Sequence, residues 1–314
     1  MSAPFADVAV LVPCYNEAAA IESVVRDLTA ALPGATVYVY DNNSRDATAR
    51  IAAAAGAVVR REPLQGKGNV VRRMFADIEA EIYVMVDGDG TYDAASAPTL
   101  IEALREGPLD LVTGARVDDD VAAYRAGHRF GNWLLTTLVA LVFGRRGSDM
   151  LSGYRVFSRR FVKTFPALSK GFEIETELTV HALELGMPLA ELPTPYKARP
   201  PGSASKLSTF KDGFRILWLI GKLVKEERPM QTFSLAALVL ALASIGLAWP
   251  VVATYLETGQ VPRLPTAVLS TGLMILAFLA VACGFILETV TRGRREMKRL
   301  RYLELPAPGA SEPH

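Results

Sequence analysis

Two carboxylates one residue apart, Asp87 and Asp89, directly follow the apolar run 82–86. That run has the length and composition of a buried strand, so both acids are expected at a strand end. Such a pair suits a divalent cation, and the intervening glycine lets a phosphate approach the backbone. Acidic residues also serve turn chemistry at strand ends, so Asp-x-Asp alone leaves an ordinary turn open.

Two further predicted strands also end in polar clusters. Residues 8–12 lead into the cluster 13–17, and residues 36–40 lead into the cluster 41–46. In an open α/β sheet, ligands lie beyond the carboxyl ends of the parallel strands. We therefore expect the three clusters to meet at one edge of a sheet.

Strands and helices alternate along the first part of the chain. The pattern predicts strands over 8–12, 36–40, 57–60, 82–86 and 109–113, and helices over 17–31, 46–55, 68–79 and 96–106. This order predicts an α/β fold with a mostly parallel, Rossmann-like sheet and helices on both faces. The later apolar run 133–143 is too short to cross a membrane and is interpreted as a buried or interfacial helix.

Two C-terminal segments, 232–256 and 264–287, contain no Asp, Glu, Lys, Arg or His. Each exceeds the roughly 20 residues that span a bilayer, and a pair of core helices would need a covering layer that the sequence does not offer. The short connection 257–263 predicts a transmembrane hairpin. Basic residues flank both outer ends, so the positive-inside rule predicts that both termini are cytoplasmic. The basic segment 210–225 is expected to be an amphipathic helix on the membrane surface, although a core-facing helix is the alternative.

Composition excludes several classes of protein. The 314 residues are 50% hydrophobic, and a net charge of +1 gives no case for nucleic-acid binding. Cys14 and Cys283 lie in separate regions and suit a reducing compartment, and the N-terminus does not resemble a secretory signal. His128 and His181 have no metal-ligand spacing. The sequence also lacks the dinucleotide-binding and P-loop glycine motifs.

Seven ordered motifs give the chain a family resemblance. They are Pro13-x-Tyr15-Asn16-Glu17, Asp41-Asn42-x-Ser44-x-Asp46-x-Thr48, Gly66-Lys67-Gly68, Asp87-x-Asp89, Gly114-x-Arg116, Asp149-x-x-Ser152-Gly153-Tyr154-Arg155 and Arg199-x-x-Gly202-x-x-Ser205-Lys206. In this order they resemble the inverting family 2 glycosyltransferases of GT-A fold. Among these, the chain is most similar to the polyprenyl-phosphate sugar transferases, which include the dolichol-phosphate mannosyltransferase group and its bacterial undecaprenyl-phosphate relatives. The resemblance covers roughly residues 7–210, and the bacterial branch also has the two trailing helices.

The resemblance implies a membrane hexosyltransferase, expected in the bacterial inner membrane. It would move a hexosyl unit from a nucleoside-diphosphate sugar, of UDP-glucose or GDP-mannose type, to polyprenyl phosphate with inversion. Whether the protein forms a homo-oligomer stays open. The implied domains are a catalytic domain over 1–206, an amphipathic juxtamembrane segment over 207–231, a transmembrane hairpin over 232–290 and a basic cytoplasmic tail over 291–314.

The resemblance also implies how the donor is held. The expected base and ribose contacts are Pro13, Tyr15, Glu17, Asp41 and the neighbouring Asn42, with Lys67 near the phosphates. A turn with a helix cap over 41–44 is compatible with this role. Asp89 would coordinate Mg²⁺ or Mn²⁺, with Asp87 beside it or on the nucleotide. Many relatives place a glutamine where this chain has Thr91, so a hydroxyl or a water would have to substitute.

The acceptor side needs cations, because a phosphate monoester is already an anionic nucleophile. The candidates are Arg116, Arg155, Arg199 and Lys206, with Ser152 and Ser205 as further substrate contacts in the same motifs. Asp149 is expected near the reacting centre, or alternatively as a loop cap. Acids alternate at 173, 175 and 177, and the resemblance implies that Glu173 and Glu175 pair with Arg155 or touch the sugar; a solvated helix start is the alternative.

Other functions fit less well. A processive polysaccharide synthase would carry a Gln-x-x-Arg-Trp signature, which this chain lacks. A transporter is disfavoured because neither predicted span contains a charged residue. A non-catalytic sugar-nucleotide-binding or scaffold subunit, and a family 2 enzyme with a different acceptor, are the alternatives that stay open.

Overall fold

The computed structural model describes residues 3–118, 149–199 and 228–308, together with Trp218, Gly221 and Lys225. The chain divides into two compact units. The first combines Met1–Leu217 with Lys298–His314, and the second is Trp218–Met297. The predicted helix within 128–143 and most of the predicted amphipathic segment lie outside the described residues.

The first unit is built on a sheet whose seven described strands lie in the order β3-β2-β1-β4-β6-β5-β7. The strands are β1 (Val8–Cys14), β2 (Thr36–Asp41), β3 (Val58–Arg61), β4 (Ile82–Met85), β5 (Leu111–Asp118), β6 (Arg155–Ser158) and β7 (Leu189–Tyr196). Strand β6 runs antiparallel to its neighbours β4 and β5, and the other pairs are parallel. The predicted mostly parallel sheet is confirmed.

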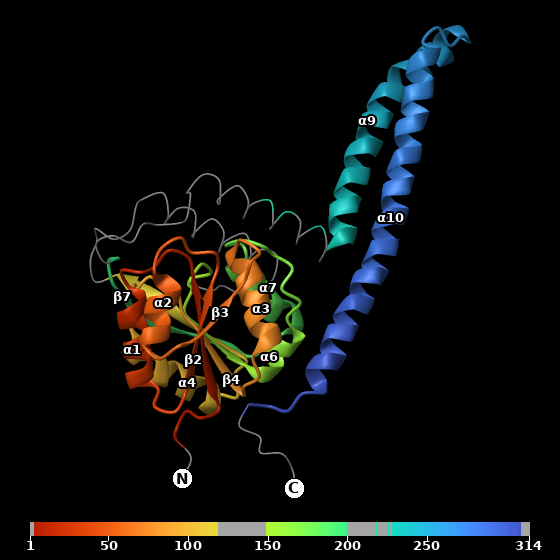
Figure 1. The fold of residues 1–314 in the computed structure, drawn as a ribbon. Coiled ribbons are helices and arrows are strands. Elements are labelled where there is room, and N and C mark those ends of the chain that lie inside the picture. Colours follow the sequence, from red (N-terminus) through yellow and green to blue (C-terminus); the bar gives the residue numbers. More distant parts are fainter. Residues whose placement is uncertain are drawn as a thin grey trace. The chain divides into compact units, whose positions relative to one another are not determined.

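Helices cover both faces of this sheet (Figure 1). They are α1 (Ile21–Ala31), α2 (Thr48–Ala54), α3 (Lys67–Asp77), α4 (Ala97–Glu106), α6 (Arg159–Thr164) and α7 (Ile174–Leu185). Val10 points to the face covered by α1, α2 and α4, whereas the next residue, Leu11, points to the face covered by α3, α6 and α7. Because successive strand residues point to opposite faces, a sheet covered on both sides requires continuous apolar strands.

The second unit is a hairpin of two long helices, α9 (Pro229–Thr258) and α10 (Leu264–Leu303, which continues into the first unit). Both are long and apolar enough to cross a membrane, and only 17% and 11% of their most apolar windows are buried. Apart from Pro229 at the start of α9, the buried residues recur every seven positions: Ala237, Ser244 and Val251 on α9, and Ser270, Ala277, Gly284 and Thr291 on α10. Small side chains at this spacing let two helix backbones approach closely.

Helix α10 crosses the predicted boundary between the hairpin and a basic tail at residues 290 and 291. It stays helical to Leu303, so the basic residues up to Arg301 belong to a helix rather than to a tail. Residues 294–301 are all good helix formers (Arg, Lys, Glu, Met and Leu) and include no proline, so the sequence gives no signal to stop there.

The last turns of α10 contact the sheet edge opposite the ends of β1, β2 and β4. Asp110 is fully buried there and accepts hydrogen bonds from Ser158 Oγ at 2.6 Å, from Arg160 Nε and from Tyr302 Oη at 2.7 Å. Lys298 Nζ pairs with Glu184 at 2.7 Å. A buried carboxylate needs such donors, so the C-terminal helix supplies part of the first unit's internal bonding.

Replacing Tyr302 with Phe should destabilise the first unit. The change removes one donor from the buried Asp110 carboxylate and should cost about 1–3 kcal/mol. We expect a lower apparent Tm of the detergent-solubilised protein by circular dichroism. Tyr255→Phe, at an exposed tyrosine of α9, is the matched control. Equal losses in the two variants would contradict the role assigned to Tyr302.

Candidate active site

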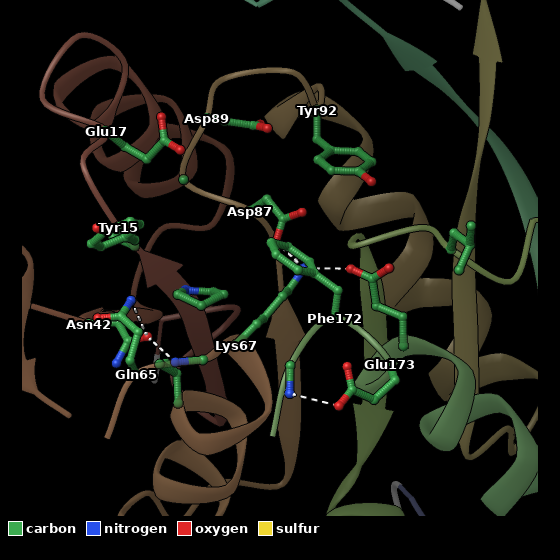
Figure 2. Close-up of a pocket in the computed structure, with 18 of the residues that line it drawn as sticks. Tyr15, Glu17, Asn42, Gln65, Lys67, Asp87, Asp89, Tyr92, Phe172 and Glu173 are labelled. Carbon is green, nitrogen blue, oxygen red and sulfur yellow. Dashed lines mark hydrogen bonds and ion pairs between the residues drawn. The ribbon is translucent and has the colours of Figure 1, made fainter. Parts of the chain in front are cut away.

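A cavity of about 650 Å³ opens at the carboxyl ends of β1, β2 and β4. Its lining includes Pro13, Tyr15, Glu17, Asn42, Gln65, Lys67, Asp87, Asp89, Tyr92, Arg116, Leu151, Phe172, Glu173, Glu175, Tyr196 and Arg199. Figure 2 shows acidic, basic and aromatic side chains converging on this space from several loops. The three polar clusters predicted from the sequence therefore do meet at one sheet edge.

Asp89 is oriented by the residue two positions after it. Its Oδ1 atom accepts from Thr91 Oγ1 at 2.6 Å and from the Thr91 amide at 3.1 Å, and Thr91 is fully buried. The other oxygen, Oδ2, lies 2.7 Å from Arg199 Nη2. Thr91 thus fixes the carboxylate from behind, while a cationic group meets its remaining oxygen.

Lys67 joins Asp87 to helix α7. Its Nζ lies 2.5 Å from Asp87 Oδ1 and 2.6 Å from Glu175 Oε1. Burial alone would lower the pKa of Lys67, but these two carboxylates raise it above its ordinary value. Burial, opposed by Lys67, raises the pKa of Asp87 to about 6, and the nearby Glu175 and Asp89 add to the increase. One ammonium group therefore bridges two acids in a poorly hydrated place and offsets one of their two negative charges.

Close contacts with neighbouring backbone or side-chain atoms explain three glycines around this group. A Cβ on Gly66 or on Gly68 would lie 2.2 Å from the carbonyl oxygen of Lys170 or of Ser169, respectively. A Cβ on Gly153 would lie 2.3 Å from Asp87 Oδ2. The Gly-Lys-Gly motif thus lets segment 169–170 approach the start of α3, and this segment leads to Phe172 at the cavity.

Asn42 holds the loop that precedes Lys67. Its Nδ2 donates to the carbonyl oxygens of Glu62 at 2.9 Å and Leu64 at 2.8 Å, and its Oδ1 accepts from the Gly66 amide at 2.7 Å. Asp41 is buried and accepts from the Ser44 amide. The expected turn over 41–44 is therefore present, while Asn42 also lines the cavity.

Arg116 and Asp149 form a bidentate pair. Arg116 Nε and Nη2 lie 2.6 and 2.7 Å from the two carboxylate oxygens. Burial alone would raise the pKa of Asp149, but the hydrogen bonds and charge of Arg116 hold it below its ordinary value. Asp149 is therefore ionised at neutral pH and orients Arg116, which lines the cavity.

The expectation that Arg155 and Ser152 contact substrate is corrected. Arg155 is fully buried and donates to the carbonyl oxygens of Ser152 and Met150 and to Thr179 Oγ1, at 3.0, 2.7 and 2.8 Å. Ser152 Oγ donates to the Gly114 carbonyl at 2.6 Å and is equally buried. The two side chains hold the turn that carries Asp149, so they lie behind the cavity rather than in it.

The other predicted site residues are placed as follows. Those that line the cavity are Pro13, Tyr15, Glu17, Asn42, Lys67, Asp87, Asp89, Arg116 and Arg199. Asp41 and Asp149 are buried next to lining residues, and Ser205 and Lys206 lie outside the described residues.

Sequence reasoning missed the aromatic lining residues Tyr92, Phe172 and Tyr196. Tyr92 immediately follows the Asp-x-Asp-x-Thr segment, and Phe172 begins the alternating acids; in both cases a neighbouring polar pattern was the available signal. Tyr196 ends a strand that the sequence analysis did not predict.

Metal ligation by protein side chains alone is limited at this site. Within the described residues, no three His, Cys, Asp or Glu side chains are grouped as a metal site. Asp87 and Asp89 nevertheless share the cavity, and the inward oxygen of Asp89 already faces a positive group. Two carboxylates of this kind fit a hard divalent cation if ligand oxygens complete its coordination.

Sequence comparison assigns the chain to a family. Residues 9–165 match Glycosyl transferase family 2, and glycosyltransferase AglJ of Haloferax volcanii is 33% identical over 300 residues, which cover 95% of this chain and 98% of that protein. The chain belongs to glycosyl transferase family 2. The dolichyl-phosphate hexose transferase of the same organism is 30% identical over 225 residues, 71% of this chain and 96% of that protein.

Solved structures agree on the fold of this family 2 chain. Glucosyl-3-phosphoglycerate synthase from Mycobacterium tuberculosis, in complex with Mn²⁺, UDP and glucosyl-3-phosphoglycerate, has a TM-score of 0.56 at 24% identity. The match covers 69% of this chain and 78% of the synthase. The predicted GT-A fold class is confirmed.

Removing the ammonium group of Lys67 should destabilise the protein in a pH-dependent way. Lys67→Met leaves Asp87 and Glu175 buried without their cation, which should cost about 3–5 kcal/mol near neutral pH. Because the pKa of Asp87 is already about 6 and should rise further without Lys67, protonation relieves the repulsion as pH falls. We expect the Tm gap between wild type and Lys67→Met to narrow from pH 8 to pH 5.

Two further variants sharpen this measurement by circular dichroism. Lys67→Met/Glu175→Gln should regain part of the lost stability, since one uncompensated carboxylate is gone. Lys197→Met, at a lysine whose side chain is 63% exposed, should leave Tm almost unchanged. A gap that stays constant or widens on acidification would contradict the assigned role of Lys67.

Proposed function

We propose that this family 2 glycosyltransferase transfers a hexosyl unit from a nucleoside-diphosphate sugar to a polyprenyl phosphate at a membrane surface. The observation that carries the proposal is one cavity lined by the paired acids Asp87 and Asp89 and by the two arginines Arg116 and Arg199. The candidate membrane helices and the similarity to a dolichyl-phosphate hexose transferase support a lipid acceptor.

The donor side comprises the loops after β1 and β2. Pro13, Tyr15 and Glu17 would bind the base and ribose, because an aromatic ring and a carboxylate suit stacking and hydrogen bonding to hydroxyl groups. Asn42 keeps the Lys67 loop in position through backbone contacts. The donor is of UDP-glucose or GDP-mannose type; UDP in the Mycobacterium tuberculosis synthase complex favours testing uridine donors first.

Asp89 would hold Mg²⁺ or Mn²⁺ through Oδ2, with Asp87 beside it and Thr91 orienting Asp89 from behind. When bound, the cation supplies electrostatic stabilisation of the negative charge that develops on the departing nucleoside diphosphate. Lys67 keeps Asp87 in place without itself being required to reach the diphosphate.

The acceptor side comprises Arg116 and Arg199. The polyprenyl phosphate is already anionic, so one of its oxygens can attack the anomeric carbon without a strong general base. The new bond joins that oxygen to the anomeric carbon, and the bond between the anomeric carbon and the diphosphate oxygen breaks with inversion. Asp149 fixes the guanidinium plane of Arg116 for contact with the phosphate oxygens.

The helices α9 and α10 would anchor the enzyme where the lipid phosphate lies. Basic residues flank both outer ends of the hairpin, so we place the catalytic domain on the cytoplasmic side, in the inner membrane of a bacterium. A hairpin that binds the lipid bilayer keeps the soluble donor and the lipid acceptor at the same interface.

Product analysis tests this function. We would incubate the full chain in detergent with Mg²⁺ or Mn²⁺, a short polyprenyl phosphate and single UDP- or GDP-sugars, and detect glycosylated lipid by mass spectrometry. Asp89→Asn should lower turnover at least about a hundredfold, because it weakens cation binding next to the leaving group.

Glu22→Gln, at an exposed helix position, is the matched carboxylate control and should keep wild-type turnover. If no donor gives glycosylated lipid, or if Asp89→Asn keeps undiminished turnover, the proposed site is contradicted. Sugar transfer to phosphoglyceric acid in place of the lipid would support the alternative of a different acceptor. Donor binding without transfer to any acceptor would favour a non-catalytic subunit.

A further inference from the structure

Arg199 contacts the oxygen of Asp89 that a cation would use. The Arg199 Nη2 atom lies 2.7 Å from Asp89 Oδ2, while Thr91 bonds only to Oδ1. The Asp89 side chain is 7% exposed, so few directions of approach to Oδ2 are left. A guanidinium group and a divalent cation therefore compete for one carboxylate oxygen.

The strand end that carries Arg199 is fastened to the loop that carries Asp89. The Lys197 amide donates to the Thr91 carbonyl at 2.8 Å, and Lys197 Nζ lies 3.1 Å from Asp93. The rings of Tyr92 and Tyr196 pack edge to face with centroids 5.3 Å apart. The backbone just before Arg199 is therefore anchored beside the loop that carries Asp89.

We propose that Arg199 occupies the cation position on Asp89 in the donor-free protein and is displaced when the cation arrives with the nucleoside diphosphate. This inference rests on the proposed function, because it takes the cation site at Asp89 as given. Like charges repel, so a cation that binds alone must displace the Arg199 guanidinium from Asp89 while no other negative group replaces the lost ion pair. A diphosphate brings negative oxygens that can receive the displaced guanidinium.

Two consequences follow for the order of events. The cation should bind weakly by itself and much more tightly together with a nucleoside diphosphate. The guanidinium leaves Asp89 only when the diphosphate of the donor can receive it, so Arg199 acts as a positioning residue that links cation binding to donor binding. An ordinary structural ion pair would have neither consequence.

Direct measurement of Mn²⁺ binding distinguishes a displaceable Arg199 from an ordinary structural ion pair. The full chain in detergent, without nucleotide, would be titrated with Mn²⁺ and the free ion followed by electron paramagnetic resonance. Arg199→Gln should bind Mn²⁺ at least about tenfold tighter than wild type, equivalent to about 1.4 kcal/mol. Arg199→Lys keeps the positive charge and should stay close to wild type, as should Arg26→Gln, at an arginine of α1 whose side chain is 68% exposed.

Addition of UDP or GDP provides the second comparison. The difference in Mn²⁺ affinity between Arg199→Gln and wild type should become smaller, because wild-type Arg199 then has phosphate oxygens to bind. Equal or weaker Mn²⁺ binding by Arg199→Gln in the absence of nucleotide, with the fold preserved by circular dichroism, would overturn the inference. Wild type that binds no Mn²⁺ even with UDP or GDP would instead refute the cation site of the proposed function.

Discussion

Charge compensation around Asp87 is the constraint on which the rest of the site depends. Asp87, Asp89 and Glu175 converge on one poorly hydrated cavity, and unpaired carboxylates there would be costly. Lys67 forms ion pairs with Asp87 and Glu175, and Arg199 forms one with Asp89. The start of α3, the loops after β4 and β7 and the start of α7 are therefore held together by opposite charges as well as by backbone hydrogen bonds.

The same arrangement holds Arg116 and Arg199, on two sides of the cavity, in different ways. Arg116 is held by both carboxylate oxygens of Asp149, and Asp149 sits on a turn that the buried Arg155 ties to α7. That side of the cavity is preorganised, as catalysis by electrostatic stabilisation requires. Arg199 instead contacts a carboxylate that a ligand-bound cation would claim. Two arginines with different carboxylate partners thus face the same cavity.

Much of the nucleotide-binding half follows from the sequence, because its strands are apolar on both faces and end in conspicuous polar clusters. The predicted strands at 36–40 and 82–86 differ from the observed ones by one residue at most. Strand β6 was missed since it is short, fully buried and antiparallel, with no alternation to read. The burial of the Arg155 side chain behind the cavity could not be predicted either. A motif gives the order of residues but not the side of a turn on which a side chain lies.

The hydrogen bond between Tyr302 and Asp110 joins residues 192 positions apart in the sequence. Everything between them, including both apolar helices of the hairpin, must leave the ribosome before Asp110 can gain its third donor. Synthesis of both apolar helices would therefore precede completion of the α/β unit. A fragment cut before α9 would lack Tyr302 and Lys298, so the catalytic part of this chain is not a module that ends where its sheet ends.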